Sequence, residues 1–266
     1  MMIGDVVARA GRKALLTALP TAKKMFNVDF VAANGENLAH GFGITEKTAA
    51  ELFRCGVDLI TGGNHTWDRK EVVSLLESAP VIRPLNYPCG AAGKGIFIAD
   101  VGGEKLAVIN LLGFMGYVDN PFNTALRAVN ELREAGVKHI AIDFHAETTS
   151  EKNSLLKLLE GKISLLCGTH THIGTDDLLI ANGTGYVSDI GLTGIRNEVI
   201  GMCSKEPISR FTTGIRRMFE TCEGELTIFQ AIIFELDDRG RCVDAFKIKS
   251  FDGGEIAVSM RHNPGW

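Results

Sequence analysis

The sequence has 266 residues, of which 45% are hydrophobic and 23% are charged, and its formal net charge is −4. That is enough apolar material for a full core, and the acidic balance excludes the basic footprint of a protein that holds long nucleic acids. The apolar runs are too short to span a membrane, and the N-terminal residues lack the apolar stretch of a signal peptide. We therefore expect a cytoplasmic protein with no membrane partner.

The six cysteines are scattered along the chain, at positions 55, 89, 167, 203, 222 and 242. None of them forms a C-x-x-C pair, so we expect reduced, buried or incidental thiols in place of a disulfide scaffold.

In chain order, apolar strands alternate with amphipathic helices through most of the sequence. The pattern predicts strand 28–34, helix 45–56, strand 57–63, helix 68–79, strand 105–113, helix 123–136, strand 138–146, helix 150–161 and strand 162–170. Thr45 and Ser150 are the expected N-caps of two of these helices, and Gly56 and Gly161 are the expected stops.

Two hairpins complete the predicted elements. One lies at residues 95–111 and turns at Gly102-Gly103; the other lies at 224–250 and turns at residues 237–240. Helix-separated strands together with hairpins predict an α/β protein with mixed sheets, either a single sheet or two packed sheets flanked by helices. We expect one domain over residues 1–266.

Polar side chains interrupt the apolar runs at the strand ends. They are Asp5, Glu36, Asn37, Asn64, His65, His145, His170 and His172. Ligands of open α/β sheets bind outside the carboxyl ends of the strands, so these segments can converge on one rim. The glycines beside them, such as Gly62-Gly63, let the backbone turn sharply and come close to a ligand.

This set of side chains has the composition of a metal site. Imidazoles with carboxylates suit Zn, Fe or Mn, and the absence of Cys from the set argues against a structural zinc site. Eight groups exceed the needs of one ion and fit two metals bridged by a carboxylate, as in hydrolases of phosphate esters. Taken singly, Asp5 could cap a helix, Glu36 and Asn37 could form a turn, and His145 could be a hydrogen-bonded core histidine.

Blocks along nearly the whole chain resemble the calcineurin-like metallophosphoesterases, and more narrowly the YmdB-like bacterial phosphodiesterases. They are IGDVV…GR (3–12), NGEN…AHGFGIT (34–45), GGNHTWD (62–68), RPLNYP (83–88), GKGI (93–96), IDFHAETTSEK (142–152), GTHTHIGT (168–175) and SDIGLTG (188–194). Two positions depart from the wider superfamily. Val7 stands where a His is usual, and Glu36 stands where an Asp commonly bridges the metals.

The resemblance implies a four-layer α/β/β/α sandwich with two metal ions, iron and/or manganese. It also implies hydrolysis of small phosphodiesters such as 2′,3′-cyclic nucleotides. By this resemblance, one metal takes Asp5, Glu36 and His172, with Asn37 near or on it. The other takes Glu36, Asn64, His145 and His170, and Glu36 bridges the two.

The mechanism that follows is attack on phosphorus by a hydroxide held between the metals, with His65 as general acid to the leaving ribose oxygen. Asp68 could orient His65, a contact that the sequence does not show. Three alternatives stay open: a phosphomonoesterase on the same centre, a non-enzymatic regulator that keeps the fold, and a homo-oligomer of either kind. A barrel amidohydrolase is disfavoured because the H-x-H pair lies past the middle of the chain.

Overall fold

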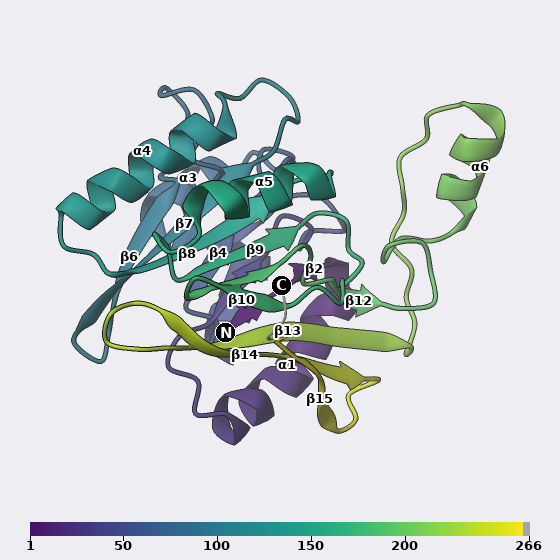
Figure 1. The fold of residues 1–266 in the computed structure, drawn as a ribbon. Coiled ribbons are helices and arrows are strands. Elements are labelled where there is room, and N and C mark those ends of the chain that lie inside the picture. The colour runs from purple at the N-terminus through teal and green to yellow at the C-terminus, as the bar shows by residue number, and fades with distance from the viewer. Residues whose placement is uncertain (263–266) are drawn as a thin grey trace.

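Two stacked β-sheets form the centre of the protein, which we describe over residues 1–262 from a computed structural model (Figure 1). The larger sheet has nine strands, with the path β15-β14-β13-β1-β3-β4-β5, and β12 joins β13 to β2. These strands are β1 (Met2–Ile3), β2 (Asp5–Val6), β3 (Ala32–Asn34), β4 (Leu59–Thr61), β5 (Val81–Ile82), β12 (Leu192–Ile195), β13 (Thr227–Leu236), β14 (Cys242–Phe251) and β15 (Ile256–Arg261). From β1 through β5 the pairing is parallel, and from β13 through β15 it is antiparallel.

The second sheet has six strands in the order β10-β11-β9-β8-β7-β6. They are β6 (Ile96–Val101), β7 (Glu104–Leu112), β8 (His139–His145), β9 (Leu165–Thr169), β10 (Leu179–Ala181) and β11 (Thr184–Val187). The four central strands are parallel, and the two edge strands are antiparallel hairpin partners. Both sheets are therefore mixed, as predicted.

Helices cover the outer faces of both sheets. The helices are α1 (Ala8–Met25), α2 (Glu46–Cys55) and α3 (Val72–Ser78) on the larger sheet, and α4 (Pro121–Glu134) and α5 (Thr149–Leu159) on the smaller one. One apolar core lies under α1 to α3, a second under α4 and α5, and a third between the sheets. Three cores separate four layers, so the predicted α/β/β/α sandwich is confirmed.

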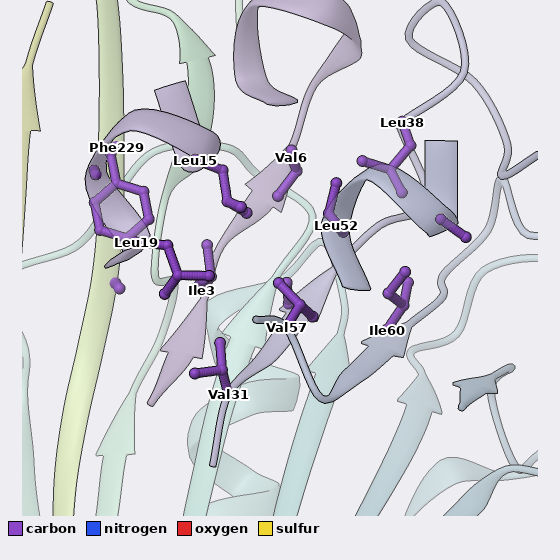
Figure 2. Close-up of a cluster of buried hydrophobic side chains, with 14 of the residues drawn as sticks. Ile3, Val6, Leu15, Leu19, Val31, Leu38, Leu52, Val57, Ile60 and Phe229 are labelled. Carbon is purple, nitrogen blue, oxygen red and sulfur yellow. The ribbon is translucent and has the colours of Figure 1, made fainter. Parts of the chain in front are cut away.

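Figure 2 shows the core under α1 and α2. Leu15 and Leu19 of α1 point at Phe229 and Ile3 of the sheet, and Leu52 of α2 lies over the same face. All five side chains are buried. Because α1 and β1 are joined across Asp5, this packing also sets where the first polar strand end lies.

The predicted elements need three local corrections. The N-cap of α5 is Thr148, whose hydroxyl accepts from the Glu151 N–H while the Glu151 side chain returns to Thr148, so Ser150 is not the cap. Helix α3 begins at Val72 and not at residue 68. Arg216 and Arg217, expected on a helical face, follow the end of α6 (Lys205–Thr213) in irregular chain.

The prediction of unpaired cysteines is wrong for two of the six. Cys203 and Cys222 form a disulfide, with Cα atoms 5.1 Å apart and a sequence separation of 19. The segment between them carries α6, which projects from the body in Figure 1. A separation of this length has no local spacing signal, because only the folding back of the segment brings the two thiols together.

No helix within residues 1–262 is long and apolar enough to cross a membrane.

The core under α1 makes a direct stability prediction. Leu15→Ala should lower the free energy of unfolding by about 2–5 kcal/mol, because it opens a cavity at a fully buried site. The neighbouring Leu16 is 43% exposed, so Leu16→Ala is the matched control and should cost less than about 1 kcal/mol. Urea unfolding followed by circular dichroism measures both. Equal losses would contradict the packing of α1 on the larger sheet.

Candidate metal centre

The carboxyl ends of strands from both sheets meet at one place. The larger sheet brings Asp5 in β2, Glu36 and Asn37 after β3, and Asn64 and His65 after β4. The smaller sheet brings His145 at the end of β8, and His170 and His172 after β9. All eight residues singled out in the sequence therefore come from segments that end at the junction of the two sheets.

Three ligand-type atoms surround Nε2 of the buried His145. Asn64 Oδ1 lies 3.0 Å away, His170 Nδ1 lies 3.1 Å away and Glu36 Oε1 lies 3.2 Å away. An imidazole nitrogen can donate one hydrogen bond at most, and the two oxygens only accept. One proton cannot satisfy this arrangement, whereas a cation at the point the atoms share can be bound by all of them. Glu36, His145 and His170 each offer a ligand atom within 4.8 Å of the others.

A second group lies on the other side of Glu36. Oδ1 of Asp5 is buried and has no hydrogen-bond partner among residues 1–262. Its neighbours are Nε2 of His172 at 3.6 Å and Nδ1 of His145 at 3.8 Å. Asn37 Nδ2 lies 3.2 Å from His172 Nε2 and 3.1 Å from Glu36 Oε1. A buried carboxylate oxygen without a partner is costly, and a cation would supply one.

Hydrogen bonds outside the cluster hold the imidazoles in orientation. Nδ1 of His172 lies 2.7 Å from the carbonyl oxygen of Ile200, to which it can donate, so its Nε2 is the nitrogen that faces Asp5. Nε2 of His170 lies 2.9 Å from a carboxylate oxygen of Glu147, which leaves Nδ1 toward His145. Such outer partners fix the tautomer and raise the basicity of a metal-binding histidine.

The charges in the cluster shift one another's pKa values. Burial raises the pKa of Asp5 to about 6, although His172 and His145 oppose the rise. Burial also works against ionisation of Glu36, but the neighbouring histidines, His145 first, together outweigh it and lower the pKa to about 2. Burial opposes the charged form of His145 as well, yet the nearby carboxylates, Glu36 first, together raise its pKa to about 9. Burial, aided by the nearby His145, lowers the pKa of His170 to about 3. A proton on His145 thus supplies the positive charge that Glu36 requires, and a metal ion would displace that proton.

His65 lies at the solvent side of this cluster. Its Nδ1 is 2.7 Å from Asp68 Oδ2, so the contact that the sequence could not show is present. Phe42 packs against the ring edge to face, with centroids 4.9 Å apart. The backbone N–H of His65 donates to Glu36 Oε2 at 2.8 Å. These contacts leave Nε2 of His65 as the nitrogen available to a substrate.

Gly63 explains why two glycines precede Asn64 and His65. A Cβ added at Gly63 would collide with the Glu36 carboxylate and with the His145 ring. Any other residue would push these two groups out of the cluster. The glycine is thus required for close approach of the backbone, as the sequence suggested.

A buried carboxylate, Asp143, ties the two sheets together directly behind the cluster. It accepts hydrogen bonds from Thr169 Oγ1 at 2.6 Å, from Asn34 Nδ2 at 3.2 Å and from the hydroxyl of Thr61. Burial raises the pKa of Asp143, while His145 and these three donors act in the opposite direction. Thr169 Oγ1 also lies 2.9 Å from His145 Nδ1, so the network reaches the imidazole itself.

Sequence reasoning missed several residues that support the cluster. They are Asp143, Glu147, Lys152 and Asp189. All four lie within two of the quoted blocks, IDFHAETTSEK and SDIGLTG, so membership of a block was the only signal for them. Their roles depend on contacts between distant segments, which no local spacing encodes.

A cavity of about 650 Å³ lies away from this cluster. It is lined by residues at the amino ends of the parallel strands, among them Met2, Leu106, His139 and Leu165. Because the polar groups gather at the carboxyl ends, the geometry assigns the chemistry to the cluster and not to the cavity.

Comparison with known proteins identifies the family. A family model described as YmdB-like protein matches residues 1–248. The chain belongs to the YmdB-like family. The resemblance found in the sequence blocks is therefore confirmed.

Relatives of this YmdB-like chain are similar over almost their full length. A protein of Bacillus subtilis strain 168, named 2′,3′-cyclic-nucleotide 2′-phosphodiesterase, is 41% identical over 245 residues, which cover 90% of this chain and 91% of the relative. A crystal structure of a hypothetical protein from Thermus thermophilus is 39% identical with a TM-score of 0.88, and covers 94% of this chain and 98% of its own. A crystal structure of a protein from Mycoplasma pneumoniae, described as a novel phosphatase, is 30% identical with a TM-score of 0.88, over 94% of this chain and 92% of its own.

The Asp143 network makes a prediction about stability. Asp143→Ala should lower the free energy of unfolding by about 3 kcal/mol, because three buried donors lose their acceptor at roughly 1 kcal/mol each. Asp119 is exposed on a loop, and Asp119→Ala is the matched control with an expected change below about 0.5 kcal/mol. Denaturant unfolding of both variants measures the difference. An Asp143→Ala protein as stable as the control would mean that this carboxylate does not join the two sheets.

Proposed function

We propose that this protein is a phosphodiesterase that uses two metal ions, iron and/or manganese, to hydrolyse small phosphodiesters such as 2′,3′-cyclic nucleotides. That it is a hydrolase of phosphate esters follows from the family and from the names of its relatives. The name of the Bacillus subtilis relative supports the cyclic nucleotide as substrate class. The donor set at the strand ends supports the two metals.

The single observation that carries the proposal is the set of ligand-type atoms that one proton cannot satisfy. Asn64, His145 and His170 would hold one ion, and Asp5 and His172, with Asn37 near or on it, would hold the other. Glu36 would bridge them, since Oε1 lies near both groups. Two ions in such a site supply Lewis-acid polarisation of the phosphoryl group and lower the pKa of water.

The donor set also suits an anionic substrate. Only two of the seven proposed ligands carry a negative charge, because Asn and neutral His contribute none. Two divalent ions would then leave a net positive centre in a protein whose overall charge is −4. A phosphodiester is drawn to such a centre by local charge, against the unfavourable global sign.

His65 is the proposed catalytic residue. Asp68 accepts from Nδ1 and favours the protonated ring, so Nε2–H would be directed at the leaving ribose oxygen. Phe42 restricts rotation of the ring about this contact. Asp68 acts as a positioning residue because it touches the imidazole and not the ligand cluster.

Monoester hydrolysis by the same centre remains the alternative, and the description of the Mycoplasma pneumoniae protein as a phosphatase favours it. The experiment that separates the two compares turnover of bis-p-nitrophenyl phosphate with that of p-nitrophenyl phosphate, and then tests 2′,3′- against 3′,5′-cyclic nucleotides. We expect about a tenfold or greater preference in kcat/KM for the diester. We also expect activity to be lost on chelation and regained with Mn²⁺. Preference for the monoester, or full activity after metal removal, would overturn the proposal.

The His65–Asp68 contact can be tested by a double-mutant cycle. His65→Ala should lower kcat by about 10²–10⁴-fold, the usual scale of general acid catalysis, with metal content unchanged. Asp68→Asn should cost less, roughly tenfold, because it leaves the acid in place but less well oriented. In the His65→Ala background the second change should have no further effect. Additive losses would show that Asp68 does not act through His65.

A further inference from the structure

Behind the histidine segment that follows β9 lies a buried ion pair that supplies none of the proposed ligands. Lys152 of α5 and Asp189, between β11 and β12, are each 1% exposed. Lys152 Nζ lies 3.1 Å from Asp189 Oδ2. The pair joins a helix of the smaller sheet's outer layer to the connection that leads toward the larger sheet (Figure 1).

This pair binds the two peptide groups on either side of His170. Lys152 Nζ donates to the carbonyl oxygen of Thr169 at 3.0 Å, and the N–H of Thr171 donates to Asp189 Oδ2 at 3.1 Å. The other oxygen, Asp189 Oδ1, accepts from Gly191 N at 2.8 Å, which fixes the carboxylate in turn. The backbone before and after His170 is therefore held from one side by a single pair of opposite charges.

The same backbone adopts a conformation that needs such support. His170 has φ of 98° and His172 has φ of 65°, both in the left-handed region that side chains other than glycine rarely adopt. Residues in such regions keep their conformation only where the surrounding contacts impose it. Without those contacts the two imidazoles would turn away from Glu36 and Asp5.

We infer that Lys152 and Asp189 are a positioning pair that aims His170 and His172 at the cation site. This inference rests on the proposed function, since it assigns the pair to metal binding. It also accounts for the last residue of the block IDFHAETTSEK and for the Asp of SDIGLTG, to which the ligand set gives no role.

The pair acts through geometry and not through its net charge. The two charges cancel, and both lie on the far side of the peptide groups from the imidazoles. A buried pair of this kind often adds little to stability over apolar residues, whereas removal of one partner leaves an uncompensated charge. The double variant Lys152→Met/Asp189→Asn avoids that cost and removes the ionic clamp while it keeps the side-chain shapes.

The test measures Mn²⁺ binding to the metal-depleted full-length protein by titration calorimetry, together with the electron paramagnetic resonance spectrum of the loaded protein. The double variant and Asp189→Asn should each bind Mn²⁺ about 10–100-fold more weakly than the unchanged protein, the range seen when outer partners of metal ligands are removed. The spectrum should change as well, because the histidines lose their fixed direction. Lys152→Arg should restore much of the affinity, since it keeps the charge and a donor.

Lys247→Met is the matched control. Lys247 is also 1% exposed and donates to a backbone carbonyl in the same segment, Thr175 at 3.3 Å, but that carbonyl lies beyond both histidines. Its Mn²⁺ affinity should stay within about twofold of the unchanged protein, because neither histidine loses a backbone contact.

The outcomes separate the two claims. If the unchanged protein binds no Mn²⁺, the proposed function fails. If it binds Mn²⁺ and the folded double variant binds equally well with the same spectrum, the positioning role is wrong and the pair only satisfies buried charge. A loss of affinity in Lys247→Met as large as in the double variant would also overturn the inference, because the effect would then follow from any buried lysine in this region.

Discussion

Two buried carboxylates, Asp5 and Glu36, set the main constraint on this structure, because the fold removes both from water. Burial of an ionised carboxylate is costly unless a positive charge or hydrogen-bond donors compensate it. The imidazoles around them compensate in part, through a proton on His145, whose pKa is raised to about 9. Asp5 is left with an oxygen that has no partner within residues 1–262. The arrangement is one in which metal ions and protons compete for the same groups.

The two-sheet architecture makes this concentration of polar groups achievable. Parallel strands present their carboxyl ends on the same side, and the stacking of two sheets brings two such sides together. Helices and three apolar cores on either side of the sheets provide the favourable burial that offsets the polar centre. Asp143 then links strands of both sheets through Thr61, Asn34 and Thr169, immediately behind the ligand cluster. Stability and site geometry thus depend on the same contacts.

The sequence predicts those parts of the structure that have a local signal. Apolar runs indicate the strands, and the Thr45 cap with Gly56 marks both ends of α2, where Gly56 has φ of 100°. The candidate ligands are recognisable because each stands where an apolar strand ends. The N-terminal boundary of α1 has no such signal, since its N-cap is Val7, which makes no side-chain capping bond. The cap of α5 is ambiguous in the sequence because hydroxyl side chains occupy all three positions 148–150.

Other features are invisible in a single sequence because they arise from contacts between distant residues. The Lys152–Asp189 pair spans 37 positions, and the Cys203–Cys222 disulfide depends on how the segment around α6 folds back. The left-handed backbone of His170 and His172 contradicts local propensity and follows from tertiary contacts alone. Such conflicts between local preference and structure are expected at functional sites, where geometry is held at a cost in stability.

The most direct test of the account is an anomalous difference map from a crystal grown or soaked with Mn²⁺. The account predicts two peaks, about 3.5–4 Å apart, as in other two-metal sites. One should lie among Asn64, His145 and His170, and the other beside Asp5 and His172, with Glu36 between them. A map with no peak at this position, or with its peaks away from Glu36, would contradict the claim that these buried groups exist to bind metal.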